Sequence, residues 1–330
     1  MIKKFITIIS VMAISLFSIV PFTACTDGEA VIKINEVTHS VFYAPLYLAD
    51  SLGYFKDEKV KIELTNGGGA DASMAALLSG SADVAFCGPE AGIYVILGGS
   101  SDAPKVFGQL TKRDGSFLVG RVRDDDFSWS KLNGKEILAG RRGGGPAMTF
   151  EYTLKTLGVS ATLHYDVAFN MMTSAFESGV ADYCTMFEPT ASDYQSAGKG
   201  YIVASVGQQS GEIPYTCFMA KQSYIDKNGD KIDAVLRAVT KAIKYIDEHD
   251  ANDVAQKIAN FFDGTSVNSL ATSIENYKSI DAWVKNMAMQ ESAFNRLQDV
   301  MQNAGELERR INFADLVLTD RANQIYNEIY

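Results

Sequence analysis

Two stretches of this sequence share the same order of residue types, and each ends in a glutamate beside a proline. Residues 79–90 run Ser-Gly-x-Ala-Asp, an apolar stretch and Gly-Pro-Glu, and residues 178–189 repeat the unit before Phe-Glu-Pro. Glu90 and Glu188 therefore hold matching positions. A carboxylate at each position can accept a hydrogen bond from an amino or ring N–H of a bound molecule. Each can equally cap the helix that follows it, and both interpretations stay open.

Aromatic side chains stand near the same positions. Phe42 and Tyr43 follow the first expected strand, Phe187 precedes Glu188, and Tyr215 follows a polar, proline-containing segment. Flat aromatic faces suit the stacking of a flat ligand. Together with two carboxylates they favour a nitrogen-bearing heterocycle over a simple anion, because ionised carboxylates repel a buried sulfonate.

Two glycine triplets indicate a different chemistry. Each precedes an expected helix, whose first backbone N–H groups can bind an anion, and the second triplet, at residues 143–145, is followed by Pro146. Arg141 and Arg142 precede the second triplet and could pair with a phosphate or sulfonate, although such arginines are more often surface charges. Arg113, in an expected hinge segment, is the better-placed cation, and its alternative role is an ion pair between the two lobes. The second triplet lacks the Gly-Lys-Ser/Thr ending of a nucleotide-binding loop. The candidate binding residues in these loops are Gly68, Gly69, Gly144 and Gly145.

Residues suited to catalysis or metal binding are few. The chain has three histidines, and only His39 follows an expected strand where it could face a ligand, so an enzyme would depend largely on His39. Cys87, Cys184 and Cys217 lie in apolar runs and lack metal-binding spacing. Their odd number and wide spacing do not indicate a disulfide framework, so we expect small buried side chains. We predict binding rather than catalysis, with no cofactor and no metal.

Strands and helices alternate along the first half, which predicts an α/β fold. Because the repeated units lie far apart, they favour two similar lobes rather than a solenoid. Polar, glycine-containing segments near Arg113 and before Tyr215 are expected to be the two hinge crossings. Residues 233–330 are mostly amphipathic helix, which we expect to pack on the first lobe. The expected division is a signal peptide over residues 1–24, a first lobe over 25–112 and 215–330, and a second lobe over 113–214.

The N-terminal residues indicate export. Two lysines precede an apolar stretch over residues 5–20, and Phe22-Thr23-Ala24-Cys25 resembles a bacterial lipobox, although its first residue is usually Leu. Acylation of Cys25 would anchor the chain to the membrane from outside the cytoplasm. No later segment is long and apolar enough to span a bilayer. The net charge of −10 argues against nucleic acid as a partner.

The order of several motifs resembles the sulfonate, nitrate and thiamine-pyrimidine (NMT1/THI5-like) group of binding proteins of ABC importers. The motifs are Ala44-Pro45-Leu46-Tyr47, Gly53-Tyr54-Phe55, the first repeated unit, the second glycine triplet with Pro146, Phe187-Glu188-Pro189-Thr190 and Gly211-Glu212-Ile213-Pro214-Tyr215. The resemblance covers most of the chain to about residue 221. It implies a type II periplasmic-binding-protein fold, with mixed sheets in two lobes and the ligand between them. It also implies an ABC permease with its ATPase as partner.

From these observations we expect a monomeric, lipid-anchored solute-binding protein that captures a small molecule. A pyrimidine of the thiamine-precursor kind is the first candidate, and a sulfonate, taurine or nitrate is the alternative. The group also includes an intracellular pyrimidine synthase, so an enzyme using His39 is the alternative from another class. A ligand-sensing adaptor for a surface receptor shares the fold and stays open.

We predict that Cys25→Ser blocks lipidation and moves the protein out of the lipid-modified fraction, because the thiol that would be acylated is then missing. Mass spectrometry of the N-terminal peptide measures this. A wild-type chain that carries no acyl mass on residue 25 would contradict the prediction.

Overall fold

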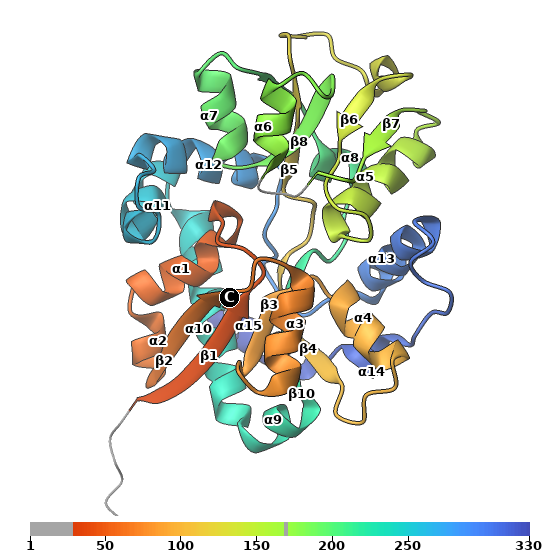
Figure 1. The fold of residues 1–330 in the computed structure, drawn as a ribbon. Coiled ribbons are helices and arrows are strands. Elements are labelled where there is room, and N and C mark those ends of the chain that lie inside the picture. The colour runs from red at the N-terminus through yellow and green to blue at the C-terminus, as the bar shows by residue number, and fades with distance from the viewer. Residues whose placement is uncertain (1–28, 168–170) are drawn as a thin grey trace, which may run out of the picture.

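Two mixed five-stranded sheets form the centres of two lobes (Figure 1). The computed structural model describes residues 29–167 and 171–330, so Cys25 lies outside the described residues. The first sheet has the order β2-β1-β3-β10-β4 and the second the order β7-β6-β8-β5-β9. The strands are β1 (Ala30–Glu36), β2 (Val60–Asn66), β3 (Val84–Cys87), β4 (Pro104–Thr111), β5 (Ser116–Gly120), β6 (Glu136–Leu138), β7 (Thr162–His164), β8 (Tyr183–Phe187), β9 (Tyr201–Ser205) and β10 (Thr216–Lys221).

The two sheets have equivalent topologies. In the first, β1 pairs in parallel with β2 and β3, and β10 enters antiparallel between β3 and β4. In the second, β6 pairs in parallel with β7 and β8, and β5 enters antiparallel between β8 and β9. Each lobe thus receives one antiparallel strand directly after the chain arrives from the other lobe. The expected α/β fold with mixed sheets is confirmed.

Helices cover the faces of both sheets (Figure 1). Those of the first half are η1 (Val41–Tyr43), α1 (Ala44–Ser51), α2 (Tyr54–Asp57), α3 (Ala70–Ser79) and α4 (Glu90–Leu97). Those of the second lobe are η2 (Trp129–Leu132), α5 (Gly145–Thr156), α6 (Met172–Glu177), α7 (Thr190–Ser196) and α8 (Val206–Ser210). The C-terminal helices are α9 (Gln222–Lys227), α10 (Gly229–Glu248), α11 (Ala251–Ile258), η4 (Ala259–Phe261), α12 (Val267–Ser279), α13 (Glu291–Asn303), α14 (Phe313–Leu316) and α15 (Asp320–Ile329).

The repeated Ser-Gly-x-Ala-Asp unit has the same structural role in both lobes. Gly80 follows α3 with φ of +80°, and Gly179 follows α6 with φ of +93°, a left-handed backbone that glycine adopts without strain. The aspartate of each unit then holds the neighbouring strand. Asp83 accepts the Lys33 N–H at 2.8 Å, and its counterpart in the second lobe accepts the Glu136 N–H at 3.0 Å. The unit therefore ends a helix and joins the next strand to the sheet.

The chain passes from the first sheet to the second over residues 112–115 and returns over residues 211–215. A third segment, between α12 and α13, lies beside these crossings. Its backbone pairs with the end of β4, where Ala282 accepts the Lys112 N–H at 2.9 Å and Val284 donates to Leu110 O at 3.0 Å. Three chain segments therefore run side by side at the hinge.

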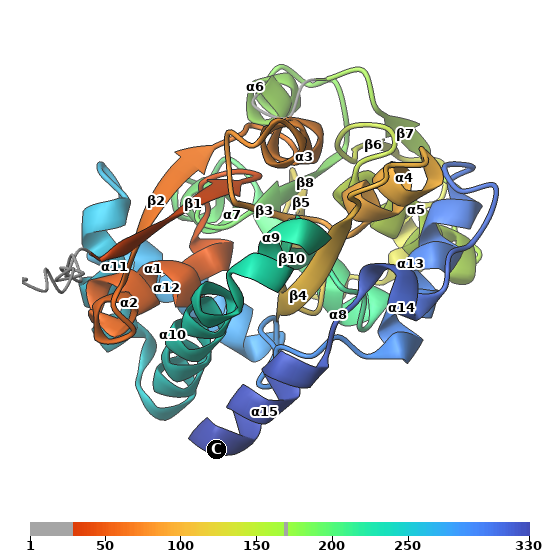
Figure 2. The ribbon, with the colours of Figure 1, turned by 90° about the horizontal axis from the view of Figure 1, so that it is seen from below.

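The long helix α10 is amphipathic, as its sequence predicts. Its apolar residues are buried, and the helix packs against α1, α2 and α15. Figure 2, seen from below, shows α10 and α15 side by side on one side of the first sheet. The buried residues of the predicted apolar stripe are Val235, Leu236, Val239, Ile243 and Ile246.

Two other C-terminal helices also reach the second lobe, in addition to the first lobe on which we expect the tail to pack. Helix α12 contacts η1 and α7, and α13 contacts α5 (Figure 1). The α12 contact is partly polar: Ser269 Oγ donates to Asp193 Oδ1 at 2.7 Å, and the Tyr277 hydroxyl accepts the Glu188 N–H at 3.1 Å. These two helices bracket the second lobe from opposite flanks.

We predict that Tyr277→Phe costs about 1–3 kcal/mol of stability, because it leaves the buried Glu188 N–H without an acceptor. Ser269→Ala removes another α12 contact, but an exposed one, and should change stability by less than about 0.5 kcal/mol. Urea unfolding measures both. If the two substitutions reduced the free energy of unfolding equally, burial of the Tyr277 hydrogen bond would not explain its contribution to stability.

Candidate ligand-binding site

The predicted aromatic residues meet where the two lobes join. Phe42 from η1 packs against Phe187 of β8 and Tyr215 of the return crossing, with ring centroids 6.0 Å and 5.9 Å away. Tyr277 of α12 approaches the same ring at 4.9 Å. Phe42 and Tyr277 are buried. The faces expected to stack on a ligand therefore pack on one another, and the lobes are closed around this cluster.

Glu90 lies beside the second glycine loop. Its side chain is 8% exposed, and a Cβ placed on Gly145 would be 3.6 Å from Glu90 Oε1, so groups from both lobes meet here. Burial raises the pKa of Glu90 from 4.5 to about 7, while its own backbone N–H favours the ionised form. The carboxylate also fills the space over Gly88, where any side chain would collide with it. Glu90 is thus a buried acid at the join of the lobes.

Asp114 occupies the first crossing and is fully buried, although the sequence pointed to its neighbour Arg113. Its Oδ1 accepts hydrogen bonds from the Ser116 N–H and Oγ, at 2.6 Å and 2.5 Å. Asp114 Oδ2 and the Tyr215 hydroxyl lie close enough for each to shift the pKa of the other, and neither atom has a second partner among the described residues. Burial raises the pKa of Asp114 to about 6. The Asp-x-Ser turn was the only sequence signal for this residue.

Arg113 pairs with carboxylates at the hinge through one guanidinium nitrogen, while its Nε is buried without a partner among the described residues. Its guanidinium lies 3.8 Å from Glu212 and 3.7 Å from Asp281, and Lys112 approaches the same two carboxylates. The alternative role, an ion pair at the hinge, is therefore the one that the structure has. Glu90 and Asp114 are left without a facing cation from this crossing.

The first glycine loop leads to a second set of unpaired polar atoms. Asn35 Oδ1 and Ser73 Oγ are buried without a partner among the described residues, and a Cβ on Gly67 would meet them at 2.5 Å and 2.6 Å. Gly68 has φ of +71° and donates to Asn66 Oδ1 at 2.9 Å. Residue 67 must therefore lack a side chain for the loop to pass these polar groups.

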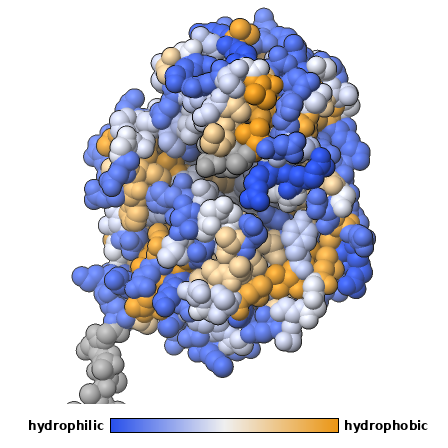
Figure 3. Space-filling view, in the orientation of Figure 1, coloured by the Kyte–Doolittle hydropathy of each residue, from blue (hydrophilic) through white to orange (hydrophobic). Residues whose placement is uncertain are grey.

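The two glycine triplets lie on opposite lobes and face charged side chains. A Cβ on Gly69 would be 3.8 Å from an Arg141 nitrogen of the second lobe. A Cβ on Gly143 would be 3.3 Å from the Glu306 carboxyl carbon, and Gly144 donates its N–H to the Arg141 carbonyl at 3.1 Å. Figure 3 shows hydrophilic side chains along the right of the boundary between the lobes, with apolar patches above and below. Arg141 of the second lobe thus approaches the first glycine loop across this boundary.

Glu188 caps a helix, which is the second of its two expected roles. Its carboxylate accepts from the Ser192 N–H and Oγ at 3.0 Å and 2.7 Å, at the start of α7. Asn276 Nδ2 of α12 donates to the same carboxylate at 2.5 Å. These contacts occupy Glu188, whereas its counterpart Glu90 has no such partners. The equivalence in sequence does not extend to the environment.

His39 is held by protein groups on both ring nitrogens. Nδ1 lies 2.8 Å from Glu36 Oε1, and Nε2 lies 2.7 Å from the Phe261 carbonyl. Two acceptors require an N–H at each position, and the hydrogen bond to Glu36 raises the pKa of His39 above 6.5, with a further contribution from the Phe261 carbonyl. Tyr47 donates to the other oxygen of Glu36 at 2.6 Å. The ring therefore has no free nitrogen to act as a base.

Tyr43 is buried against Phe86 nearby.

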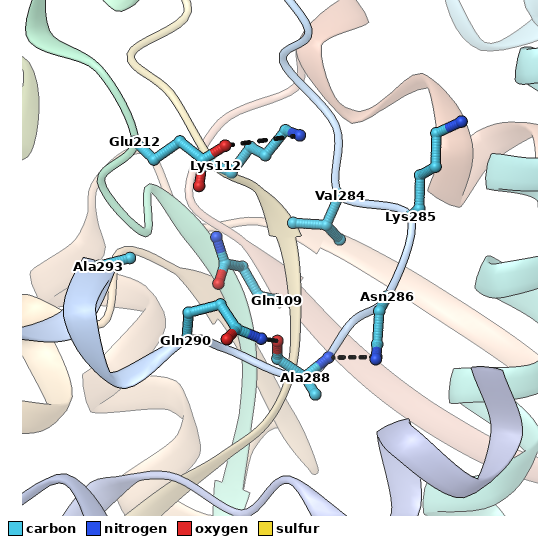
Figure 4. Close-up of a pocket in the computed structure, with 9 residues that line it drawn as sticks. All are labelled: Gln109, Lys112, Glu212, Val284, Lys285, Asn286, Ala288, Gln290 and Ala293. Atoms are coloured by element: carbon cyan, nitrogen blue, oxygen red, sulfur yellow. Dashed lines mark hydrogen bonds and ion pairs between the residues drawn. The ribbon is translucent and has the colours of Figure 1, made fainter. Parts of the chain in front are cut away.

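A hollow of about 160 Å³ lies at the hinge rather than between the aromatic rings (Figure 4). Gln109 points into it, and the Lys112–Glu212 pair closes one side. A second hollow, of about 210 Å³, lies beside Gly80 and Tyr224. Neither includes a predicted binding residue. Within residues 29–167 and 171–330 there is no cluster of metal ligands, and none of the helices could cross a membrane.

Two mixed sheets of equivalent topology, two crossings and buried polar groups between the lobes define the architecture of a two-lobed solute-binding protein. The chain belongs to the NMT1/THI5-like family, whose family model matches residues 41–252. It is 39% identical over 320 residues to YtlA of Bacillus subtilis (strain 168), which is named as a candidate binding protein; the match covers 95% of this chain and 96% of that protein.

The fold is that of periplasmic binding proteins of ABC importers. The nitrate-binding protein NrtA of Synechocystis PCC 6803 aligns with a TM-score of 0.72 and 15% identity, over 91% of this chain and 89% of that one. The aliphatic sulphonate-binding protein SsuA of Escherichia coli aligns with a TM-score of 0.71 and 15% identity, over 89% and 99%. The expected family is confirmed. At these identities the two structures establish the fold and leave the ligand open.

The raised pKa of Glu90 makes a pH-dependent stability testable. The folded protein binds this proton more tightly than the unfolded chain, so the stabilisation is complete below about pH 4.5 and is lost as the pH rises through about 7. Glu90→Gln should therefore be more stable than the wild type at pH 8, by on the order of 3 kcal/mol, and nearly equal at pH 4.5. Asp114 acts in the same direction at lower pH.

Urea unfolding at several pH values between 4.5 and 8 measures this difference. Glu188→Gln is the matched control, because it alters another buried glutamate. It should lose about 1–3 kcal/mol at pH 8, because one of the two oxygens that accept from Ser192 and Asn276 becomes an NH2 group, which cannot accept. A wild type and Glu90→Gln with equal pH dependence would show that Glu90 is not buried as an acid.

Proposed function

We propose that this protein is the extracytoplasmic solute-binding component of an ABC importer and that it is not an enzyme. The observation that carries the proposal is the set of buried polar groups where the lobes meet. Asp114 Oδ2 and the Tyr215 hydroxyl face each other and have no further partner among the described residues, and the Glu90 carboxylate accepts only from its own backbone N–H. Buried polar groups in native proteins are almost always hydrogen-bonded, so this set is suited to a ligand held between the lobes. The engaged nitrogens of His39 argue against a catalytic base.

The proposal extends to the organisation of the chain. The first lobe would comprise residues 25–112 and 215–330, and the second residues 113–214, after removal of a signal peptide over residues 1–24. The protein would act as a monomer, fixed to the outer side of the cell membrane by lipid on Cys25. It would deliver its ligand to a permease with an ATPase. Family membership and the names of NrtA and SsuA support the role of a solute-binding protein, whereas the lobe boundaries, the anchor and the monomeric state are proposed from the sequence alone.

The chemistry around the cluster supports a flat, nitrogen-bearing ligand. Two acids, Glu90 and Asp114, can accept from N–H groups, and neither faces a cation from the first crossing. Phe42, Phe187 and Tyr215 could stack on a ring once they separate. A pyrimidine of the thiamine-precursor kind is the class that we propose. A bound cation or amine would also lower the cost of ionising these buried acids.

A sulfonate, taurine or nitrate is the second candidate, and a specific contact favours it. Arg141 approaches Gly69 at the start of α3, so a guanidinium and the N-terminus of a helix come together there, although the Asp71 carboxylate lies closer to Gly69 than Arg141 does. The structural neighbours named for nitrate and sulphonate agree with this chemistry. The acids at the centre of the cluster oppose it, because an anion would meet their charge.

Ligand entry requires the closed cluster to open. In the structure, rings from both lobes pack together around Phe42, so ligand contact with both lobes must replace ring contacts. A ligand that touches both lobes would stabilise a closed state around itself. The flanking contacts of α12 and α13 limit how the second lobe can rotate.

We predict that an aminopyrimidine raises the melting temperature. At a hundredfold excess over Kd the added stability is about 2.7 kcal/mol, which corresponds to several degrees. Glu90→Gln and Asp114→Asn should each weaken binding at least ~10-fold, because each removes a charged acceptor. Glu328→Gln changes a half-exposed acid of α15, outside the hinge and the cluster, and should leave affinity unchanged.

Thermal shift assays with aminopyrimidines, flavin precursors, taurine, alkanesulfonates and nitrate test the proposal. If the melting temperature rises only with taurine or nitrate, and Glu90→Gln and Asp114→Asn do not change that rise, the proposal of a heterocyclic ligand is wrong. The proposal of a solute-binding protein would be unaffected. Mass spectrometry of small molecules that co-purify with the protein gives an independent test. A protein that retains no ligand and responds to none of these compounds would argue against the proposed solute classes.

A further inference from the structure

Two of the three described cysteines lie directly opposite each other in the first sheet. Cys87 ends β3, and Cys217 is its partner in the antiparallel register with β10. Both belong to one apolar cluster. The next pair in the register, Phe86 and Phe218, stacks in a different apolar cluster at 4.4 Å. Because side chains alternate across a sheet, the two thiols share one face and the two phenylalanines share the other.

This placement fits the geometry of a covalent bridge. Directly opposed residues of antiparallel strands have Cα atoms about 4.5–5.5 Å apart. Disulfides span Cα separations of about 4.4–6.8 Å. Cys184 lies opposite Val119 in the second sheet, so it cannot join the pair. We propose that Cys87 and Cys217 form a disulfide across β3 and β10 once the protein is in an oxidising compartment. The location outside the cytoplasm rests on the proposed function.

In the structure both thiols are free and buried. Burial raises the pKa of Cys87 and of Cys217. The nearby Glu90 carboxyl raises both pKa values further, and Cys87 raises that of Cys217. Thiolate is the reactive form, so the native, buried pair is oxidised slowly. The bond should therefore form while β10 docks during folding, before the sulfurs lose contact with solvent.

A disulfide-bearing oxidant, for example glutathione disulfide, supplies the redox balance. The thiolate of one cysteine attacks a sulfur of the oxidant, forms a mixed disulfide and expels one glutathione thiolate. The thiolate of the second cysteine attacks the mixed disulfide, closes the Cys87–Cys217 bond and expels the second glutathione. The two cysteines are oxidised, the glutathione disulfide is reduced, and the two thiol protons end on the two glutathione thiolates.

The bridge would join the backbones that carry two proposed ligand contacts. Cys87 lies three residues before Glu90, and Cys217 lies two residues after Tyr215. Strand β10 is also the first segment of the first lobe after the return crossing. A covalent bond here would hold the return crossing against the loop of Glu90 and would constrain the unfolded chain over a long loop.

The test uses the purified protein carrying Cys25→Ser, which removes a competing thiol. The chain is unfolded with a reductant, refolded in mixed reduced and oxidised glutathione, alkylated with iodoacetamide in denaturant, and digested without reduction. We expect the peptide of Cys87 joined to that of Cys217, an alkylated Cys184, and a chain about 2 Da lighter than the reduced one before alkylation. The melting temperature should rise by roughly 5–10 °C over that of the reduced protein.

Two variants control the assignment. Cys184→Ala should give the same cross-link, whereas Cys87→Ala should leave Cys217 alkylated or joined to glutathione. Recovery of Cys87 and Cys217 as separately alkylated peptides from natively refolded wild type would overturn the proposal, as would a bridge to Cys184. No ligand takes part in this experiment, so its failure would leave the proposed function untouched.

Discussion

The packing of one ring, Phe42, governs how the two lobes meet. Rings from the second lobe, the return crossing and α12 surround it, and Trp283 Nε1 donates to its carbonyl at 2.8 Å. The first crossing passes so close that a Cβ on Gly115 would lie 2.8 Å from the Phe42 ring. Residue 115 must therefore be glycine for this packing to exist. The hinge, the join of the lobes and the candidate site share this single constraint.

The polar groups beside Phe42 make the contact between the two lobes acidic. Buried acids without a facing cation are costly, and proteins keep them mainly where they serve a function. Glu90 and Asp114 fit that description, because burial raises the pKa of both. Glu188 does not, because a helix N-terminus and Asn276 satisfy it. The contrast between two glutamates at equivalent sequence positions separates a candidate ligand contact from a structural cap.

Much of the architecture followed from local patterns, because the repeated unit encodes local events. A glycine ends a helix and an aspartate binds the adjacent strand, so the unit predicted two similar lobes. The site followed less well. The path of the first crossing determines that Asp114 is buried while Arg113 pairs with carboxylates at the hinge. The hydrogen bonds of Glu188 depend in part on Asn276, which lies far along the chain. The opposition of Cys87 and Cys217 depends on sheet register, which no spacing reveals.

The three segments at the hinge are linked by charge. Lys112 and Arg113 of the first crossing approach Glu212 of the return crossing and Asp281 of the third segment. These carboxylates are about half exposed, so dissolved ions screen the attractions over about 8–10 Å at physiological ionic strength. Hinge rotation that separates these groups would become easier as salt rises. The relative stability of open and closed forms would then depend on the ionic strength of the surroundings and not on neutral osmolytes, which do not screen charge.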